Sequence, residues 1–497
     1  MGSVPGQFQP LLPNISVKMV TLLLLLLLPF ASAKRPASPE RLSAQSLASQ
    51  PAPAYTELWF QEDLDHINRD PGSINIRVLK LVSATSLPNG PMIVYMGNEG
   101  PIEQFFNMSG FITTVLPTQV AGANIYFIEH RYYGQSMPKP FTWAYLNTEQ
   151  VLYDYADIIM QLRPSNSTPV IVMGGSYGGM LAAWMRIKYT HVVDGAIASS
   201  APVFMTLDNG GGYYANVTGV LNHYGCGSYV QQAFYYLSIA ANQTEYWPQL
   251  ASLFQSCSYF KSSSDIDALN QWIIGAFATV VQSNYPGASN VDTQLPSWPA
   301  NATCQYFNNY AKQPNQNMWG WIQTLAKSMQ VAYNTSGTNQ CFDILGESSF
   351  TPNGWDYQTC TELWCPQGTT NVTDVFPPYP WNADAQVEYC QATYGVFPRA
   401  DWIPINYGMT SINSQVLKYT SNIMFVNGAL DPWNYGCVTS TTNPNLIAVT
   451  MINGAHHTDL RSPTPQDTLD INATRIQEVT QINQWIAAKS LPTPTYA

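Results

Sequence analysis

Gly174-Gly175-Ser176-Tyr177-Gly178 is the stretch of sequence that decides the fold. Its pattern, Gly-x-Ser-x-Gly, follows an apolar β run at residues 170–173 and precedes a run at residues 180–189 that is typical of a helix. A nucleophilic serine on a sharp strand-to-helix turn needs this context, because the flanking glycines let the backbone pass closely. A glycine-rich turn with an incidental serine is the alternative interpretation. The position between a strand and a helix favours the functional interpretation.

Apolar runs and helical patterns alternate on both sides of this turn. Short apolar runs at residues 92–96, 124–128 and 196–198 are typical of buried strands. Asn147 with Gln150 resembles a helix capping box, and apolar residues then recur with helical spacing. Strands that alternate with helices in this way predict an α/β fold, with a parallel sheet covered on both faces. We expect residues 55–204 to form the first part of this domain.

The sequence pattern changes at about residue 205. Residues 205–350 are rich in Asn, Gln, Tyr and Ser, and they carry helical stretches in place of strands. We therefore expect an insertion here rather than more of the sheet. Strand patterns return at residues 423–426 and 447–449, so residues 351–497 are expected to form the second part of the α/β domain.

The N-terminus has the parts of a secretory signal peptide. Lys18 precedes an apolar run of about eleven residues, and the small residues Ala31-Ser32-Ala33 follow it. This run is shorter than the ~20 residues that a membrane span needs, so residues 1–33 are expected to be cleaved rather than to anchor the chain. No later segment has the length and apolarity of a span. Residues 34–54, rich in Ser, Ala, Pro and Gln, are expected to be a linker or pro-segment.

The composition is that of an acidic secretory protein. The net charge is −11 and 10% of the 497 residues are charged, which disfavours nucleic acid and anionic membranes as partners. The even number of cysteines, eight, favours disulfides in an oxidising compartment. The acidic balance fits a lysosome or vacuole, and secretion fits equally well. Candidate glycosylation sites are Asn107, Asn166, Asn216, Asn242, Asn301, Asn334, Asn371 and Asn472.

A serine hydroxyl is a weak nucleophile and needs a base that is itself oriented by an acid. In folds with this strand-to-helix turn the chain order is serine, acid, histidine. Four of the six histidines fit this order poorly: His66, His130, His191 and His223. The other two, His456 and His457, follow the last expected strand, and Asp431 follows the strand before it. Adjacent side chains point in different directions, so only one of the two histidines can serve, and the residues alone leave the choice open.

Two backbone N–H groups are expected to hold the oxyanion that forms when the serine attacks. The first belongs to Tyr177, the residue after the candidate nucleophile. The second is expected from the loop after an early strand, at Gly97 or Asn98. A plain turn is the alternative for this loop, and the two interpretations are compatible.

Other chemistries have weaker support. A metal site from His456, His457 and Asp459 lacks any accompanying ligand cluster, so we expect no metal. Gly210-Gly211-Gly212 lies in no strand–helix context, so nucleotide binding is disfavoured as well. No cofactor is expected.

Further motifs accompany these residues along most of the chain. They are Leu64-Asp65-His66, Gly97-Asn98-Glu99-Gly100, Glu129-His130-Arg131-Tyr132-Tyr133-Gly134, Gly174 to Trp184, Asn284-Tyr285-Pro286, Trp355 with Gln358-Thr359-Cys360-Thr361-Glu362, Asp431-Pro432-Trp433 and Gly454-Ala455-His456-His457. In these motifs the sequence resembles the S28 family of serine peptidases, which includes lysosomal Pro-X carboxypeptidase and dipeptidyl peptidase II.

The resemblance implies an α/β-hydrolase fold with a mostly helical cap at residues 205–350. It identifies His456, the first of the paired histidines, as the base. It also implies peptide substrates cleaved next to proline, with Met180 and Trp433 at positions that line an apolar pocket and Glu99 as a further substrate-binding candidate. A rigid apolar proline ring suits a slot of Met and Trp, although core packing is the alternative role for both residues.

The disulfide pattern of the family suggests the pairs Cys226–Cys304, Cys257–Cys341 and Cys360–Cys390, and a Cys365–Cys437 bond is a guess for the other two. We expect a serine exopeptidase that cleaves next to proline through an acyl-enzyme. The resemblance at residues 284–290 favours a Pro-X carboxypeptidase. The alternative is a dipeptidyl peptidase that releases N-terminal X-Pro or X-Ala dipeptides. A secreted esterase and a non-catalytic binding protein are the remaining classes. A homodimer is the candidate oligomeric state.

Overall fold

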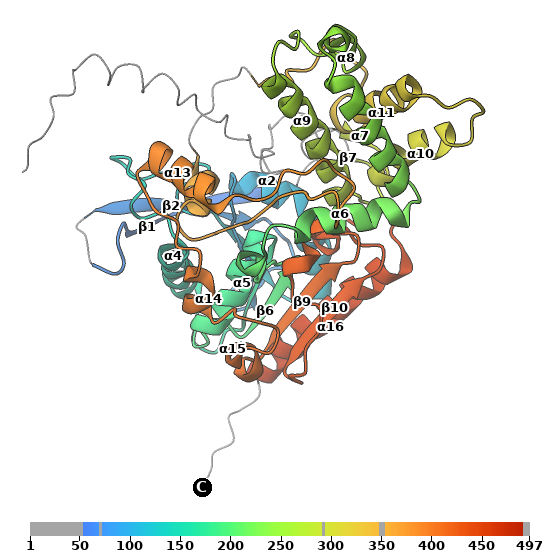
Figure 1. Cartoon of the computed structure of the whole chain (residues 1–497). Coiled ribbons are helices and arrows are strands. Elements are labelled where there is room, and N and C mark those ends of the chain that lie inside the picture. The colour runs from blue at the N-terminus through green and yellow to red at the C-terminus, as the bar shows by residue number, and fades with distance from the viewer. Residues whose placement is uncertain (1–52, 69–71, 291–293, 347–352, 491–497) are drawn as a thin grey trace, which may run out of the picture.

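An eight-stranded sheet lies at the centre of the computed structural model, which describes residues 53–68, 72–290, 294–346 and 353–490 (Figure 1). In spatial order the strands are β1 (Tyr55–Asp63), β2 (Ser73–Leu81), β4 (Asn124–Ile128), β3 (Met92–Met96), β5 (Val170–Gly175), β6 (Gly195–Ser199), β9 (Ile423–Gly428) and β10 (Leu446–Met451). β2 is antiparallel to both of its neighbours, and the strands from β4 to β10 are parallel. This topology is that of the α/β-hydrolase fold.

The central strands are buried on both faces, which is why they consist of continuous apolar runs. Successive residues of β3 point to opposite cores: Val94 belongs to one hydrophobic cluster and Ile93 to the other. Leu152 and Leu181 cover the first face, and Trp485 covers the second. These residues come from helices α4 (Thr148–Leu162), α5 (Tyr177–Lys188) and α16 (Leu469–Ser490). The second face also packs against α2 (Ile102–Met108), a π-helical turn at Phe111–Val115 and α3 (Leu116–Gln119).

Only half of the predicted capping box forms at the start of α4. The Asn147 side chain accepts a hydrogen bond from the Gln150 N–H at 3.0 Å, as an N-cap should. The Gln150 side chain does not return this bond. Its Nε2 donates to Asp65 Oδ1 at 2.7 Å and its Oε1 accepts from the His66 N–H at 2.9 Å. Gln150 therefore ties the segment after β1 to α4.

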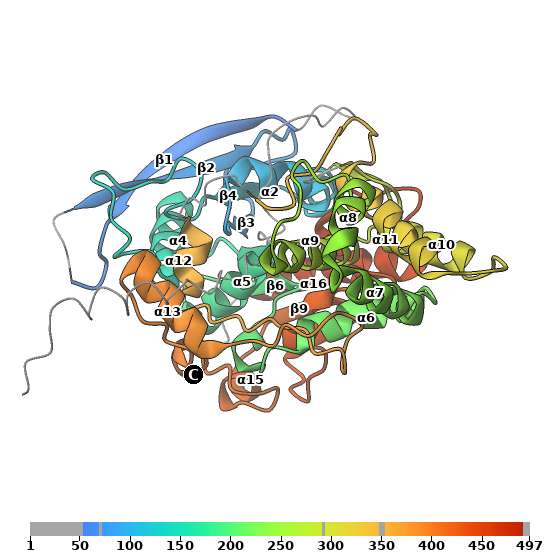
Figure 2. The same ribbon diagram turned by 45° about the horizontal axis from the view of Figure 1, so that its top comes forward.

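In the described residues, six α-helices lie between β6 and residue 346 (Figures 1 and 2). They are α6 (Gly212–His223), α7 (Gly227–Ala241), α8 (Trp247–Leu253), α9 (Ser263–Gln282), α10 (Pro299–Tyr310) and α11 (Met318–Tyr333). We call them the helical lobe. A short hairpin of β7 (Ser289–Asn290) and β8 (Gln294–Leu295) joins α9 to α10. Both figures show the lobe gathered to one side of the sheet, in green and yellow.

Four shorter helices precede β9: α12 (Gly354–Thr359), α13 (Ala383–Tyr394), α14 (Trp402–Tyr407) and α15 (Gln415–Tyr419). Three disulfides connect residues from α6 to α13, and they join the pairs that the family resemblance suggests: Cys226–Cys304, Cys257–Cys341 and Cys360–Cys390. Cys365 and Cys437 are both buried and are not joined to each other, so the guessed fourth bond is wrong for this structure. The first part of the sheet lies before the first of these cysteines.

The predicted signal peptide at residues 1–33 and almost all of the predicted linker at residues 34–54 lie outside the described residues. Within the described part of the chain, no helix combines the length and the apolar character that a membrane crossing requires.

Candidate active site

The candidate residues follow the ends of parallel strands, which meet at one edge of the sheet. Gly175, the last residue of β5, pairs with Ser199 of β6, and Gly428 of β9 pairs with Met451 of β10. The two loops after β9 and β10 pack backbone against backbone. A Cβ at Gly428 would lie 2.4 Å from the Gly454 carbonyl oxygen, so this approach requires a glycine. The strand register therefore brings the two loops of the predicted acid and base together.

Ser176 lies on a strained turn between β5 and α5. Its backbone angles are φ 57° and ψ −126°, a conformation that L residues rarely adopt and that the surrounding structure must impose. Its N–H donates to the Ser199 carbonyl at 2.9 Å, which fixes the turn to β6. The residue is 8% exposed and stands directly before the N-terminus of α5. The strand-to-helix turn expected from the sequence is thus present at Ser176, and the role of this residue as the nucleophile stays a prediction.

His456 and Asp431 form a buried hydrogen-bonded pair. The Nδ1 atom of His456 lies 2.9 Å from Asp431 Oδ2, and both residues are 1% exposed. The other carboxylate oxygen of Asp431 accepts from the Trp433 N–H at 2.9 Å. An ionised carboxylate at Nδ1 favours the tautomer that carries its proton there, which leaves Nε2 as a proton acceptor. Within the described residues His456 Nε2 has no hydrogen-bond partner.

His457 lies on the side of Ser176 and not against Asp431. Its ring stands next to the strand that leads into the elbow, since a Cβ at Gly175 would lie 3.1 Å from the His457 Cγ atom. Its N–H donates to Ser200 Oγ at 2.8 Å. The rings of the two histidines are 4.4 Å apart. The structure thus gives the aspartate partner to the first histidine, and it places the pair beside the strand that carries the serine.

Gly97 and Asn98 stand close to the residue that follows Tyr177. A Cβ at Gly178 would lie 3.3 Å from the Asn98 Cγ atom, so the loop after β3 packs directly on the first turn of α5. The Gly97 carbonyl accepts from the fully buried hydroxyl of Tyr155 at 2.6 Å. In a trans peptide the next N–H points the opposite way from this carbonyl, so Tyr155 fixes the direction of the Asn98 N–H. No motif in the sequence indicates this role of Tyr155.

The side chain of Tyr177 is held by a histidine that the chain order had set aside. His130 is fully buried, and burial lowers its pKa to about 4, so the ring is neutral at higher pH. Its Nε2 lies 3.0 Å from the Tyr177 hydroxyl, and its Nδ1 lies 2.6 Å from the Arg131 carbonyl oxygen. Gln358 Nε2 also donates to that hydroxyl at 2.9 Å. His130 therefore supports the oxyanion candidate and makes no contact that would suit a base.

Of the three substrate-binding candidates, Trp433 is the one with described ring contacts to a residue of the proposed triad. Its indole is 9% exposed, lies edge-on to Tyr213 with ring centroids 4.9 Å apart, and is 6.3 Å from the His456 ring. Met180 is 1% exposed on the first turn of α5 and belongs to the same hydrophobic cluster as Trp433. Glu99 is partly exposed and follows Asn98 directly. Trp433 and Met180 are thus buried apolar side chains whose role in a pocket stays a prediction, whereas Glu99 is a polar group at the candidate oxyanion loop.

Two residues at the end of α9 and just after it, Gln282 and Tyr285, hold the backbone of His456. The His456 N–H donates to the carbonyl of Gln282, the last residue of α9, at 3.3 Å. The Tyr285 hydroxyl donates to the His456 carbonyl at 3.1 Å and accepts from Arg461 Nη2 at 2.7 Å. Sequence analysis missed Gln282 entirely and found Tyr285 only as part of a family motif. No local pattern signals such contacts, because they join residues far apart in the chain.

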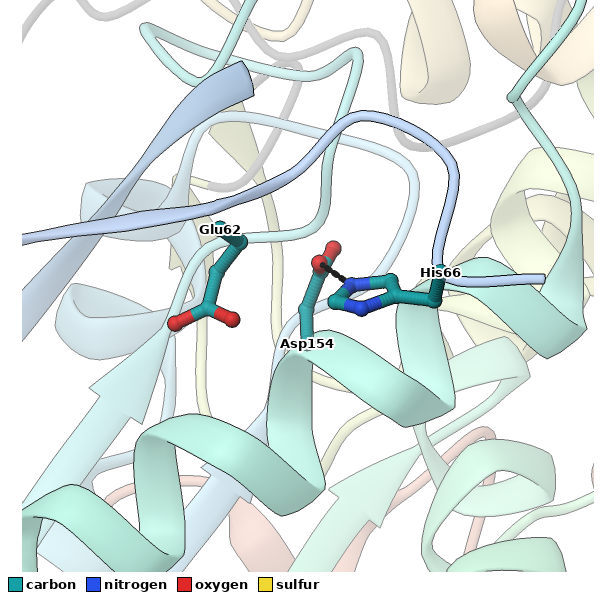
Figure 3. A group of neighbouring side chains, drawn as sticks. All are labelled: Glu62, His66 and Asp154. Atoms are coloured by element: carbon teal, nitrogen blue, oxygen red, sulfur yellow. Dashed lines mark hydrogen bonds and ion pairs between the residues drawn. The ribbon is translucent and has the colours of Figure 1, made fainter. Parts of the chain in front are cut away.

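One other cluster contains a metal-ligand set in the described part of the chain. The ligand atoms of Glu62, His66 and Asp154 all lie within 4.8 Å of one another (Figure 3). His66 Nε2 is 2.7 Å from Asp154 Oδ1. Burial, together with the nearby Asp154 charge, raises the pKa of Glu62 to about 8, so this carboxyl keeps its proton at neutral pH. A protonated acid and an aspartate already engaged make a poor metal site.

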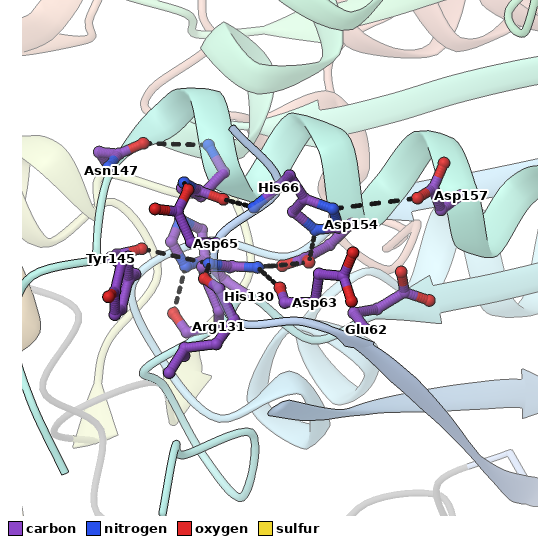
Figure 4. A network of polar contacts seen from close by, with 12 residues as sticks. Glu62, Asp63, Asp65, His66, His130, Arg131, Tyr145, Asn147, Asp154 and Asp157 are labelled. Carbon is purple, nitrogen blue, oxygen red and sulfur yellow. Dashed lines mark hydrogen bonds and ion pairs between the residues drawn. The ribbon is translucent and has the colours of Figure 1, made fainter. Parts of the chain in front are cut away.

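Arg131 supplies the cation that Asp154 needs, as Figure 4 shows. Its Nε and Nη2 atoms donate to the two oxygens of Asp154, each at 2.6 Å, in a fully buried two-pronged pair. Its Nη1 and Nη2 also donate to the carbonyls of Leu64 and Asp63 at 2.8 and 3.0 Å. The network therefore fastens the end of β1 to α4, and we assign it a structural role.

The eight candidate glycosylation sites differ in exposure. Asn107, Asn166, Asn242, Asn371 and Asn472 are exposed, whereas Asn216, Asn301 and Asn334 are partly buried. The Asn216 Nδ2 atom, which would carry a glycan, donates to the Pro432 carbonyl at 3.2 Å. Glycosylation stays a prediction at all eight, and Asn216 is the position least suited to it.

Comparison with known proteins adds to this geometry. The family model described as Serine carboxypeptidase S28 matches residues 83–478. Lysosomal Pro-X carboxypeptidase of Homo sapiens is 36% identical over 493 residues, which cover 94% of this chain and 97% of that protein. The Bos taurus protein of the same name is 35% identical over 495 residues, with the same two shares. Prolyl carboxy peptidase like protein 5 of Caenorhabditis elegans is 32% identical over 433 residues, 81% of this chain and 84% of that protein. The region matched by the family model includes Ser176, Asp431 and His456.

Proposed function

The chain belongs to the serine carboxypeptidase S28 family and is a serine peptidase, and from that premise we propose that it is a Pro-X carboxypeptidase-like exopeptidase. Ser176 is its nucleophile, His456 its general base and Asp431 the acid that orients the base. The observation that carries this assignment is the buried His456–Asp431 hydrogen bond of 2.9 Å, with Nε2 of the same ring left as an acceptor at the strand edge where Ser176 stands.

The reaction follows from these positions. Ser176 Oγ attacks the carbonyl carbon of the scissile peptide bond, and its proton passes to His456 Nε2. The carbonyl π electrons move to the oxygen, and the N–H groups of Tyr177 and Asn98 stabilise the oxyanion. The C–N bond then breaks, and the leaving amine takes the proton from His456. Water repeats the sequence on the acyl-enzyme: it gives a proton to His456, attacks the ester carbon and releases the acid and Ser176.

The proposed specificity rests on two apolar side chains and on the relatives. We place the Trp433 indole and the Met180 thioether in the wall of the substrate pocket, where they favour a rigid proline ring over a charged or polar side chain. Two of the three relatives described above carry the name Pro-X carboxypeptidase. Arg461, which is tied through Tyr285 to the backbone of His456, is a cation of the kind that a terminal carboxylate needs. A dipeptidyl peptidase would need an acid at the terminal amine instead.

We also propose that the protein acts in the lysosomal or secretory pathway. The relatives named above include lysosomal proteins, and the three disulfides require an oxidising compartment for their formation.

Peptides with a free or a blocked end test the activity directly. The purified protein is incubated with an N-blocked peptide that ends in Pro-Phe, and with an X-Pro amide whose amine is free. Release of phenylalanine from the first supports the carboxypeptidase, whereas release of the dipeptide from the second supports a dipeptidyl peptidase. Cleavage of neither, with hydrolysis of lipid esters instead, would refute the exopeptidase proposal.

A single substitution tests the nucleophile. Ser176→Ala should abolish turnover, a loss of at least about 10³-fold, without changing the thermal unfolding midpoint. Ser238→Ala, on an exposed position of α7, is the matched control and should retain full activity. Full activity in the Ser176→Ala protein would exclude the serine mechanism.

A further inference from the structure

Gln282, the last residue of α9 in the helical lobe, contacts both sides of the candidate site. It is 4% exposed. Its side-chain Oε1 accepts from the Trp433 indole Nε1 at 2.9 Å and from the Tyr213 hydroxyl at 3.2 Å. Its main-chain carbonyl accepts from the His456 N–H at 3.3 Å. One lobe residue thus joins the proposed base to the aromatic wall of the proposed pocket.

The hydrogen bond from the Trp433 indole to the Gln282 side chain fixes the orientation of the indole. A tryptophan has one polar atom, and a buried indole N–H without an acceptor is unfavourable, so the acceptor fixes the ring plane. Tyr213 packs edge-on against the same indole, at an interplanar angle of 68°, and donates to the same Gln282 oxygen. The indole is therefore oriented by one oxygen that two aromatic donors share.

We propose that Gln282 is a specificity-determining positioning residue of this peptidase: its amide oxygen sets the orientation of the Trp433 indole, and hence the fit of the pocket to a proline ring. The inference rests on the proposed function and goes beyond it, because it assigns the selectivity to a residue of the inserted lobe that touches neither the scissile bond nor the nucleophile. Its main-chain carbonyl, together with the Tyr285 hydroxyl, holds the backbone of His456, and no side-chain substitution at Gln282 removes that carbonyl.

Gln282→Met separates the two contacts. Methionine has nearly the same length and volume, offers no strong acceptor, and retains the main-chain carbonyl that holds His456. The ratio of kcat/KM for a peptide with proline before the scissile bond to that for the matching alanine peptide should fall about tenfold, the size of one buried neutral hydrogen bond. Hydrolysis of the alanine peptide should change less than about threefold, because the base stays in place.

A double-mutant cycle shows whether Gln282 acts through the indole. Trp433→Phe removes the donor and keeps an aromatic ring in the pocket. If the two residues act through their hydrogen bond, Gln282→Met lowers the proline-to-alanine ratio in the wild-type background and has a much smaller effect in the Trp433→Phe background, where only the Tyr213 bond to the same oxygen remains to be lost. Gln271→Met is the matched control, because it makes the same chemical change eleven residues upstream on α9, ~16 Å along the helix axis. It should leave the ratio unchanged.

The outcomes separate this inference from the proposed function. If the wild type cleaves proline peptides and Gln282→Met keeps the wild-type ratio, or if the effects of the two substitutions simply add, the role of Gln282 is refuted and the function stands. If the wild type cleaves neither peptide, the proposed function fails. The ratio is then measured as rates of inactivation by prolyl and alanyl diphenyl phosphonates, which need only the serine, the base and the pocket. Equal inactivation rates in wild type and Gln282→Met would overturn the inference there too.

Discussion

Replacing Glu362 by glutamine should make the protein more stable at neutral pH and leave it unchanged at acidic pH. Glu362 follows α12 and is fully buried. Its two oxygens accept hydrogen bonds from the Thr148 N–H at 2.7 Å and from the Thr148 hydroxyl at 3.0 Å. Burial raises the pKa of this carboxyl from 4.5 to about 7, and the two Thr148 bonds offset only part of that rise. The folded protein therefore keeps a proton here that the unfolded chain gives up.

The magnitude follows from the difference between the two pKa values. Between pH 4.5 and pH 7 the folded state binds the proton and the unfolded state releases it, so the free energy of unfolding falls as the pH rises. The contribution of Glu362 is complete below pH 4.5 and is lost as the pH passes through 7. A difference of roughly 2.5 pKa units corresponds to about 3 kcal/mol. Glutamine has no proton to lose, and its amide oxygen can still accept from the Thr148 N–H.

The assay is urea unfolding of wild type and Glu362→Gln at a series of pH values from 4.5 to 8. The free energies of unfolding should nearly coincide at pH 4.5, and the variant should exceed the wild type by about 3 kcal/mol at pH 8. Glu388→Gln, on the exposed side of α13, makes the same chemical change and should not alter the pH dependence. A constant difference between Glu362→Gln and wild type across this range would refute the reasoning, because it would mean that Glu362 loses its proton equally in both states.

Two further substitutions test the site and its support. Tyr155→Phe removes the hydroxyl that fixes the Gly97 carbonyl, so kcat should fall about tenfold at nearly constant KM, as expected for a misdirected oxyanion donor. A rise in KM alone, measured with a proline peptide, would contradict that role. Asp154→Asn leaves the buried Arg131 guanidinium without its charge partner and should cost about 3–5 kcal/mol in urea unfolding. Asp157→Asn, one turn away and half-exposed, should change stability by no more than about 0.5 kcal/mol; similar losses in both variants would show that the ion pair is not responsible.

The central strands could be predicted because burial on both faces leaves a simple mark in the sequence. Apolar runs at residues 92–96 and 124–128 coincide with β3 and β4, and the run at 170–173 lies within β5. β1, which forms one edge of the sheet, and its neighbour β2 were not predicted. β1 is half exposed and mixes Glu and Gln with Trp and Phe, so it has neither the continuous run of a central strand nor a helical period.

The elements that carry the candidate site were predictable, whereas the contacts between distant elements were not. The elbow at Ser176 and the two loops at Asp431 and His456 each have a local motif. The choice between His456 and His457 needed either the family resemblance or the hydrogen bond to Asp431, since the two histidines are adjacent and chemically alike. Gln282 has no motif at all. Its role depends on where α9 ends relative to two loops of the sheet, which is a property of the tertiary structure.

Several buried acids have raised pKa values, and these make the stability of the fold depend on pH. Burial raises the pKa of Glu62 to about 8 and of Glu362 to about 7, and it also raises the pKa values of Glu129, Asp459 and Glu478. Each of these groups makes the folded state less stable as the pH rises above the acidic range. On the other side, the pKa of Asp65 is lowered to about 2, because bonds from Asn68, Gln150 and the backbone outweigh its burial, so its contribution is lost only at very low pH.

His130 opposes this trend, because its lowered pKa of about 4 means that the unfolded chain binds a proton below pH 6.5 that the folded protein does not. The raised pKa values of Glu62 and Glu362 act on stability in the opposite direction. Burial also keeps His130 neutral at mildly acidic pH, and a neutral ring can accept the Tyr177 hydroxyl bond. Near pH 5 the folded protein therefore keeps the protons of Glu62 and Glu362, while the His130 ring is neutral and can hold the Tyr177 side chain. An acidic compartment, such as the lysosome in the proposed lysosomal or secretory pathway, would suit these protonation states.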